Sequence, residues 1–103
     1  MRPRGFRISE RAADDLTTIY DHIAKENPRA ARHVIESIEA KIKSIAALGL
    51  TGSPRGHLRS GLRMVVSRNF LIYFRALPSH LLIIRILHGR QDISSQDFPE
   101  SET

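Results

Sequence analysis

Two consecutive stretches of helical periodicity constrain the fold of this chain most strongly. In each stretch apolar side chains recur at spacings of three and four, which places them on one side of a helix. The first stripe comprises Ala12, Leu16, Ile19, Tyr20 and Ile23, and the second comprises Ala31, Val34, Ile35, Ile38, Ile42, Ile45 and Leu48. Neither helix can bury its stripe alone, and the connection between them is short, so the two are predicted to form an antiparallel hairpin.

Residues with strong capping preferences mark the ends of both helices. Ser9 is a suitable N-cap for the first helix, which should end near Glu26. Asn27 followed by Pro28 indicates the N-cap and the first turn of the second helix. Gly49 suits the left-handed position that follows a last helical turn. The second helix is therefore predicted over residues 28–48.

Short runs of β-type sequence flank this hairpin. Residues 3–8 alternate in the manner of a first strand, with Phe6 and Ile8 on one face. Residues 49–61 contain four Gly and one Pro and are predicted to form a long loop. Three further runs follow, and the short turns between them favour an antiparallel meander of strands at 62–67, 70–77 and 81–88.

The order of these elements predicts an α+β fold of the type β-α-α-β-β-β. The helical hairpin should cover one face of a small, mainly antiparallel sheet and leave the other face, with its strand-borne arginines, open. Residues 1–92 are predicted to form a single domain. Residues 93–103 are acidic and rich in Ser and Gln, and are expected to form a flexible tail in which Phe98 is able to dock on the domain.

The composition removes several classes of function. There is no Cys, and the five histidines show no ligand spacing, so no metal site is predicted. No Gly-rich loop follows a strand and opens a helix, so no phosphate-containing cofactor is expected. No apolar run approaches the roughly 18 residues of a membrane span, and we expect a cytoplasmic protein that makes no contact with a membrane.

Positive charge is concentrated in the second half of the chain. The formal net charge is +5, and residues 49–92 hold seven Arg against the single carboxylate of Asp92. Such an excess either keeps a small protein soluble or forms a basic face for an anionic partner, which would be nucleic acid or an acidic protein segment.

Several short motifs resemble the RelE/ParE toxins of bacterial type II toxin–antitoxin modules. The helical hairpin is similar in Ile-Ser-Glu-Arg-Ala-Ala-Asp-Asp-Leu at 8–16 and Pro-Arg-Ala-Ala-Arg at 28–32. The strands are similar in Gly-Leu-Arg at 61–63, Phe-Leu-Ile-Tyr-Phe-Arg at 70–75 and Ile-Leu-His-Gly-Arg-Gln-Asp at 86–92. The resemblance covers residues 6–92, and its closing motif is closer to the ParE branch.

The resemblance implies a toxin that is neutralised by a small antitoxin, with a ParD-like ribbon–helix–helix protein as the expected partner. It also implies that operator DNA is reached only through the antitoxin. ParE-like members poison DNA gyrase, whereas RelE-like members cut mRNA in the ribosomal A site. All three Lys lie on the helices, and no Asp or Glu lies between Gly49 and Arg90 to act as a base. We therefore expect a gyrase inhibitor that is not an enzyme. Ribosome-dependent mRNA cleavage and a non-toxic interaction module remain as alternatives.

Eight residues are candidates for function. If the protein is a ribonuclease, the catalytic set would be His57, Arg63, Arg85 and His88. If it acts by binding, the contacts with target or antitoxin would come from Arg55, Arg59, Arg63, Arg68 and Arg90.

Each candidate also has a purely structural interpretation. His88 ends a strand whose neighbours on the same face should be Leu82, Ile84 and Ile86, which favours a packed, hydrogen-bonded residue. Arg63 and Arg85 should either face the open side of the sheet or pair with a carboxylate, for which Asp92 is the nearest candidate. Asp14 and Asp15 are interpreted as charges on the solvated face of the first helix.

Overall fold

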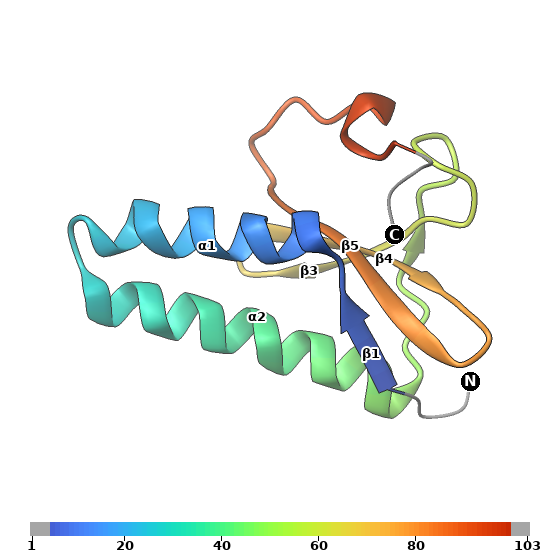
Figure 1. Ribbon diagram of the computed structural model, residues 1–103, viewed down its shortest axis with the longest axis horizontal. Helices are drawn as coiled ribbons and strands as arrows, with labels where there is room; N and C mark the ends of the chain where they lie inside the picture. The colour runs from blue at the N-terminus through green and yellow to red at the C-terminus, as the bar shows by residue number, and fades with distance from the viewer. Residues whose placement is uncertain (1–4, 100–103) are drawn as a thin grey trace.

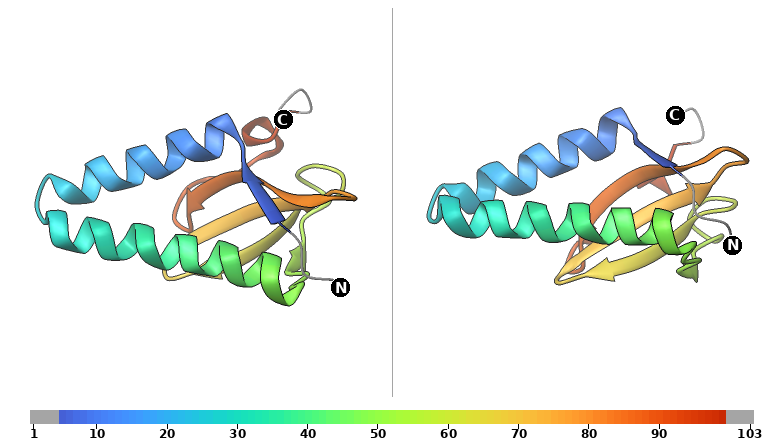
Figure 2. Two further views of the ribbon diagram at one scale, coloured as in Figure 1. Left: turned by 60° about the horizontal axis from the view of Figure 1, so that its bottom comes forward. Right: turned by 90° about the horizontal axis from the view of Figure 1, so that it is seen from below.

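The computed structural model describes residues 5–99 and contains the predicted helical hairpin (Figure 1). Helix α1 spans Glu10–Ala24 and helix α2 spans Pro28–Leu48. The two helices run side by side and form one layer of the molecule (Figure 2). They are the two α-helices of residues 5–99. Neither is long and apolar enough to cross a membrane.

The helix ends confirm the predicted caps. The hydroxyl oxygen of Ser9 accepts a hydrogen bond from the N–H of Ala12, and the side-chain oxygen of Asn27 accepts one from Ala30, each at 3.0 Å. Gly49 follows α2 in the left-handed conformation with φ of 65°, which a residue without Cβ adopts at little cost.

Five strands form one mixed sheet, in which the predicted meander occupies the centre. The strand order is β1-β5-β4-β3-β2; β1 runs parallel to β5, and the other neighbours are antiparallel. The bounds are β1 Gly5–Ile8, β2 Ser53–Pro54, β3 Arg63–Ser67, β4 Phe70–Ala76 and β5 His80–His88. The predicted fold class is confirmed, with the two-residue β2 added inside the segment that was predicted to be a loop.

A β-bulge in β5 interrupts the alternation predicted for residues 81–88. Tyr73 of β4 lies opposite Arg85, but the next residue, Phe74, lies opposite Ile83. Ile84 is therefore an extra residue in β5. The prediction that Leu82, Ile84, Ile86 and His88 share one face is wrong, because the first two face one side of the sheet and the last two the other.

Apolar side chains are buried on both faces of the sheet. The helices cover the first face, where the cluster comprises Ala12, Ile38, Ile42, Ile45, Ala46, Phe70, Ile72, Phe74, Leu81, Ile83 and Ile86. A second cluster lies on the opposite face and comprises Leu62, Met64, Tyr73, Ile84, Leu87 and Phe98. The expectation that the second face is open is therefore wrong for the part of the sheet that this cluster occupies.

The segment after β5 supplies the cover for that second face. A 3-10 turn at Ser95–Asp97 leads to Phe98, which is 2% exposed and lies against Tyr73 with their ring centroids 4.7 Å apart. The expected docking of Phe98 is thus observed, and Ile93 packs against the same cluster. The remainder of the predicted tail, residues 100–103, lies outside the described residues.

Candidate functional site

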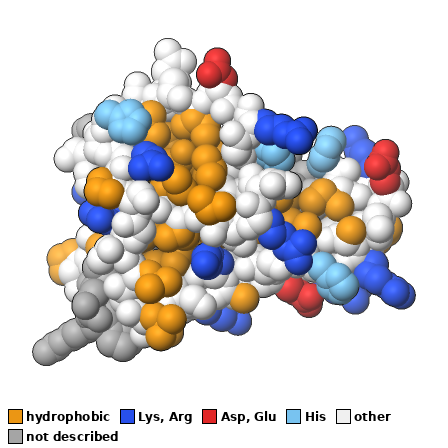
Figure 3. All heavy atoms as spheres, turned by 180° about the vertical axis from the view of Figure 1, so that it is seen from behind, with side chains coloured by type: hydrophobic (Ala, Val, Ile, Leu, Met, Phe, Trp, Pro, Cys, Tyr) orange, Lys and Arg blue, Asp and Glu red, His pale blue; other side chains and the backbone are white. Residues whose placement is uncertain are grey.

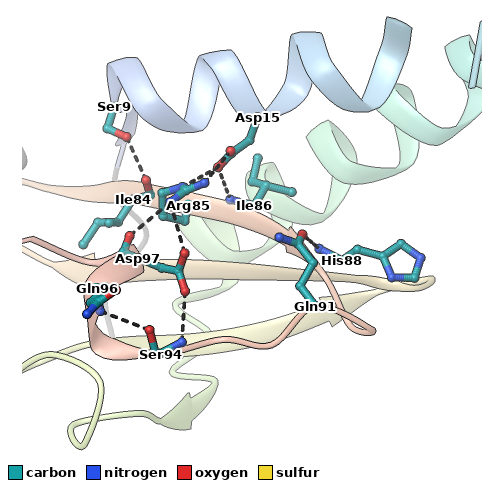
Figure 4. Close-up of polar contacts among 10 residues, drawn as sticks. All are labelled: Ser9, Asp15, Ile84, Arg85, Ile86, His88, Gln91, Ser94, Gln96 and Asp97. Carbon is teal, nitrogen blue, oxygen red and sulfur yellow. Dashed lines mark hydrogen bonds and ion pairs between the residues drawn. The ribbon is translucent and has the colours of Figure 1, made fainter. Parts of the chain in front are cut away.

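Arg85, a candidate catalytic cation, is bound into the fold by a carboxylate of α1 (Figure 4). Its Nε and Nη2 donate to the two carboxylate oxygens of Asp15 at 2.8 and 2.9 Å, and the side chains are only 12% and 13% exposed. Its Nη1 donates to the backbone carbonyl of Asp97 at 3.1 Å. Of the two arrangements expected for Arg85, the structure shows the pair with a carboxylate, but the partner is Asp15 rather than Asp92. The interpretation of Asp15 as a mere surface charge is also wrong.

The backbone of β5 explains why this carboxylate is the partner. β1 pairs with β5 only as far as Ile83, so the rest of β5 has no strand on that side among residues 5–99. The Ser9 hydroxyl donates to the carbonyl of Ile84, and the Asp15 carboxylate accepts the N–H of Ile86, each at 2.9 Å. Side chains at the start of α1 therefore bind backbone groups of β5 that would otherwise be open to another strand.

Arg59 is a structural residue and not an exposed contact. Its side chain is 8% exposed, and its Nη1 donates to the carbonyl of Pro99 at 3.1 Å. This bond connects the loop before β3 with the end of the described chain, next to the buried ring of Phe98. The expectation that Arg59 is presented to a partner is therefore wrong, because the packing of residues 93–99 encloses it.

The other loop candidates also make contacts with backbone carbonyl groups. Arg63 donates through Nε to the carbonyl of Thr51 and through Nη2 to that of Gly52, the latter at 3.5 Å. Arg55 donates to the carbonyl of the preceding residue at 2.7 Å. Arg63 thus braces the turn that carries β2. His57 is exposed in the loop between β2 and β3.

The pKa of Tyr73 is raised above its ordinary value of 10.0, chiefly because the side chain is buried. The nearby charge of Arg55 lowers this pKa, and that of Asp97 raises it. Tyr73 therefore keeps its proton at neutral pH and serves the second cluster as a large, mainly apolar side chain.

His88 is packed and hydrogen-bonded, as its structural interpretation predicted. Its ring lies edge-on to Phe70 with centroids 5.3 Å apart, and its Nδ1 accepts the backbone N–H of Arg90 at 3.0 Å.

Exposed cations gather instead around the turn between β3 and β4. Two adjoining hollows of about 190 and 430 Å³ meet there and share Val66 and Arg68. We call this region the β3-edge surface; it is lined by Ser37, Ala40, Lys41, Ser44, Val66, Ser67, Arg68, Asn69, Leu71, His88, Gly89 and Arg90. On the side of the molecule seen in Figure 3, hydrophobic side chains likewise reach the surface in patches bordered by Lys and Arg.

No group of three or more His, Asp or Glu side chains within residues 5–99 is placed to hold a metal ion. The hollows of the β3-edge surface contain neither a phosphate-binding Gly-rich loop nor a carboxylate. The chemistry that this region offers is recognition of negative charge by Arg and Lys.

Comparison with known proteins assigns the chain. A sequence model of the ParE toxin of the type II toxin–antitoxin system parDE matches residues 6–93. The chain belongs to the ParE toxin family. Its structure is similar to a chain of the chromosomal ParDE toxin–antitoxin system from P. aeruginosa, with a TM-score of 0.71 and 25% sequence identity. That similarity covers 82% of this chain and 95% of the other, and no match is found among curated proteins.

This ParE-family toxin does not bring the candidate ribonuclease residues together. Arg63 opens β3, whereas His88 lies beside Phe70 at the opposite end of the strands. His57 belongs to the loop near Arg63, and Arg85 lies under α1 with its guanidinium bound to Asp15. Among the candidate contact residues, the structure brings Arg68 and Arg90 together at one hollow.

Most members of the β3-edge surface of this ParE-family chain were not candidates from the sequence, among them Lys41 and Val66. Lys41 is one of several charges on α2 and shows its place only once α2 is set against β3. Val66 shares its strand face with the buried residues Leu62 and Met64 by alternation, but it lies beyond the second cluster and is 52% exposed. No pattern in the sequence distinguishes Val66 from its buried neighbours.

Proposed function

We propose that this ParE-family protein inhibits DNA gyrase in the cytoplasm and is neutralised by a small antitoxin of the ribbon–helix–helix type. The family match over residues 6–93 supports the toxin role, and the related structure from P. aeruginosa is described as a ParDE toxin–antitoxin system. In this proposal the toxin reaches operator DNA only through the antitoxin.

The dispersal of the candidate acid–base set supports gyrase inhibition over mRNA cleavage. Metal-free cleavage at a 2′-OH needs a base, a cation and an acid around one phosphate. Here the guanidinium of Arg85 is bound by Asp15, and Nδ1 of His88 accepts an N–H from the chain itself. His57 and Arg63 lie near the opposite end of β3 from His88. A toxin with this arrangement acts through surface contacts with another protein.

The contact residues in this proposal differ from the original set of five arginines. Arg68 and Arg90 are exposed and line one hollow, so they are the members that we assign to a partner. Arg59 and Arg63 support such contacts only indirectly, since both bind backbone carbonyl groups of the fold. Arg55 is half-buried in the loop and donates to a backbone carbonyl group, so we do not assign it to a partner.

The test compares two activities of the purified protein. One assay measures inhibition of DNA supercoiling by gyrase, and the other measures cleavage of mRNA on programmed ribosomes. We expect inhibition in the first and intact mRNA in the second. Cleaved A-site mRNA with unaffected gyrase would establish the ribonuclease alternative. A folded protein that is inactive in both assays would instead indicate an interaction module without toxicity.

A further inference from the structure

Strand β1 has an open outer edge. It pairs with β5 in parallel, and no strand among residues 5–99 lies on its other side. The N–H of Ser9, directly after β1, donates to the carbonyl of Ile83 in β5 at 2.9 Å. Backbone groups alternate in direction along a strand, so the N–H and C=O of Arg7 also face β5, whereas those of Phe6 face away from the sheet. Phe6 therefore offers both a donor and an acceptor to a further strand.

A small hollow lies between this edge and α2. It has a volume of about 100 Å³ and is lined by Phe6, Ile8, Glu39, Ile42 and Lys43. Pockets that hold cofactors or substrates usually measure about 300–1,000 Å³, so this hollow is too small for such a ligand. Phe6 and Ile8 are only half-buried although they pack against the core, and a chain added at the edge would cover them further.

The charged groups beside the hollow balance each other. Glu39 and Lys43 are exposed and stand one helical turn apart on α2, with the buried Ile42 between them in sequence. α2 ends beside the start of β1 (Figures 1 and 2). One carboxylate and one ammonium group present no net charge to nucleic acid or to an acidic protein segment. They do suit a partner that carries the same two charges in reverse order.

We propose that the outer edge of β1 is the interface between two copies of this chain. A two-fold interface is self-complementary, so each group finds its partner within the same set of residues. With the axis at Phe6, the two β1 strands pair in antiparallel fashion, and each Phe6 donates its N–H to the Phe6 carbonyl of the other copy. The Glu39 carboxylate of each copy then faces the Lys43 ammonium group of the other.

The register at Phe6 also avoids a clash of like charges. Arg7 lies opposite Gly5 of the other copy, where a second Arg7 would be repulsive. Gly5 is exposed, and the space that a Cβ would occupy there is open, so the long side chain of Arg7 has room. The two five-stranded sheets thereby become one continuous sheet with both helical hairpins on the same side.

The dimer is independent of gyrase inhibition and of neutralisation. The strand order places β1 and the β3-edge surface at opposite edges of the sheet. Arg68 and Arg90 therefore lie at the two outer ends of the continuous sheet and stay accessible. A toxin that fails to inhibit gyrase could still form this dimer, and a monomeric toxin could still inhibit gyrase, so the two proposals are tested separately.

Sedimentation equilibrium of the purified full chain tests the dimer. We expect the mass of one chain in dilute solution and twice that mass in concentrated solution. The dimer should weaken as salt rises from about 50 to 500 mM, because its two ion pairs are exposed and are screened. The mass of one chain at every concentration up to about 1 mM would overturn the proposal, since any association would then be weaker than about 1 mM in Kd.

Amide hydrogen exchange locates the interface. We compare exchange in dilute, monomeric protein with exchange in concentrated, dimeric protein. We expect exchange at Phe6 to slow by about tenfold or more, and exchange at Arg7 to stay the same, because the Arg7 N–H already faces β5 in the monomer. Slower exchange confined to Val65–Ser67, near the opposite edge of the sheet, would place the contact elsewhere and overturn the β1 interface.

Charge reversal on α2 tests the proposed pairing. Glu39→Lys places Lys opposite Lys43 of the other copy, so we expect the Kd of the dimer to rise by about fivefold or more. Glu39→Lys combined with Lys43→Glu restores opposite charges across the axis and should recover most of the wild-type affinity. Asp21→Lys is the control, because Asp21 is exposed on α1, does not line the hollow, and undergoes the same change in charge.

Two results of this series would contradict the proposal. One is an equal rise in Kd for Glu39→Lys and Asp21→Lys, because net charge alone would then weaken the dimer. The other is a double variant that remains as weak as Glu39→Lys, because the two charges would then not face each other across the axis.

Discussion

The carboxylate of Asp15 holds the guanidinium of Arg85 through two hydrogen bonds of 2.8 and 2.9 Å, and it also accepts the N–H of Ile86. Paired hydrogen bonds of this kind between Arg and a carboxylate are short and directional. Asp15 thereby fixes the side chain of Arg85 and also binds the backbone of β5 at the edge of the sheet. The same contacts occupy a cation that the sequence alone left available for catalysis.

Loss of this carboxylate should destabilise the fold. Asp15→Ala leaves a mostly buried guanidinium and the Ile86 N–H without their partner, so we expect a loss of about 2–4 kcal/mol in the free energy of unfolding. Asp14→Ala is the matched control, because Asp14 is exposed on the same helix and should change stability by about 0.5 kcal/mol or less. Urea denaturation measures both. Equal effects at the two positions would show that the pair contributes little.

Phe98 should be as important as a residue of the central core. Phe98→Ala removes a ring that is 2% exposed from the second cluster, and we expect a loss of about 3 kcal/mol. Phe98→Leu retains most of the apolar volume and should lose less than half as much. A melting temperature unaffected by Phe98→Ala would mean that residues 93–99 do not pack on the sheet in solution.

Arg59 and Arg90 should differ in their effects on stability. Arg59→Ala removes a buried hydrogen bond to the carbonyl of Pro99, and we expect a loss of about 1–3 kcal/mol. Arg90→Ala removes an exposed side chain and should alter stability by about 0.5 kcal/mol or less. Thermal unfolding distinguishes the two. If Arg59→Ala loses toxicity, its melting temperature therefore decides whether the cause is a lost contact or a less stable fold.

Stability should fall at alkaline pH because of Tyr73. Burial raises the pKa of this side chain in the folded state above the ordinary 10.0, so the folded protein holds a proton that the unfolded chain releases. The contribution of protonated Tyr73 to stability is full below the pKa of the unfolded chain, and it is lost as pH rises through the folded-state pKa. Tyr73→Phe should reduce the drop in melting temperature between about pH 8 and pH 11.

The control for this titration is the second Tyr of the chain. Tyr20 is 39% exposed on α1, and Tyr20→Phe should leave the alkaline loss of stability as in the wild type. An identical pH dependence in Tyr73→Phe and the wild type would assign the alkaline transition to other groups.

The elements that the sequence predicts well are those that local patterns encode. The two helices follow from periodic apolar residues and from the capping preferences of Ser9 and Asn27, all of which act within a few residues. The central strands follow from β-type runs separated by short turns. The two-residue β2 leaves too little sequence to show a period, so only its pairing with β3 reveals it.

The site is less predictable, because its contacts join residues that are distant in sequence. Asp15 and Arg85 are 70 positions apart, and nothing in α1 marks Asp15 out from Asp14. The bulge at Ile84 moves His88 to the other face, which simple alternation cannot anticipate. Arg59 is buried only because Pro99 and Phe98 return to the sheet.

The central claim is that the toxin inhibits gyrase through surface contacts and needs no proton shuttle. The most direct test measures the concentration of purified toxin that halves the rate of gyrase supercoiling, for the wild type, His57→Ala and His88→Gln. We expect the folded variants to agree with wild type within about threefold, since a peripheral side chain of a binding interface is usually worth about 1 kcal/mol or less. Deleting a general base costs a nuclease roughly 10²–10⁴-fold in rate. Abolished activity in folded His57→Ala or His88→Gln, with A-site mRNA cleaved by the wild type, would contradict the account.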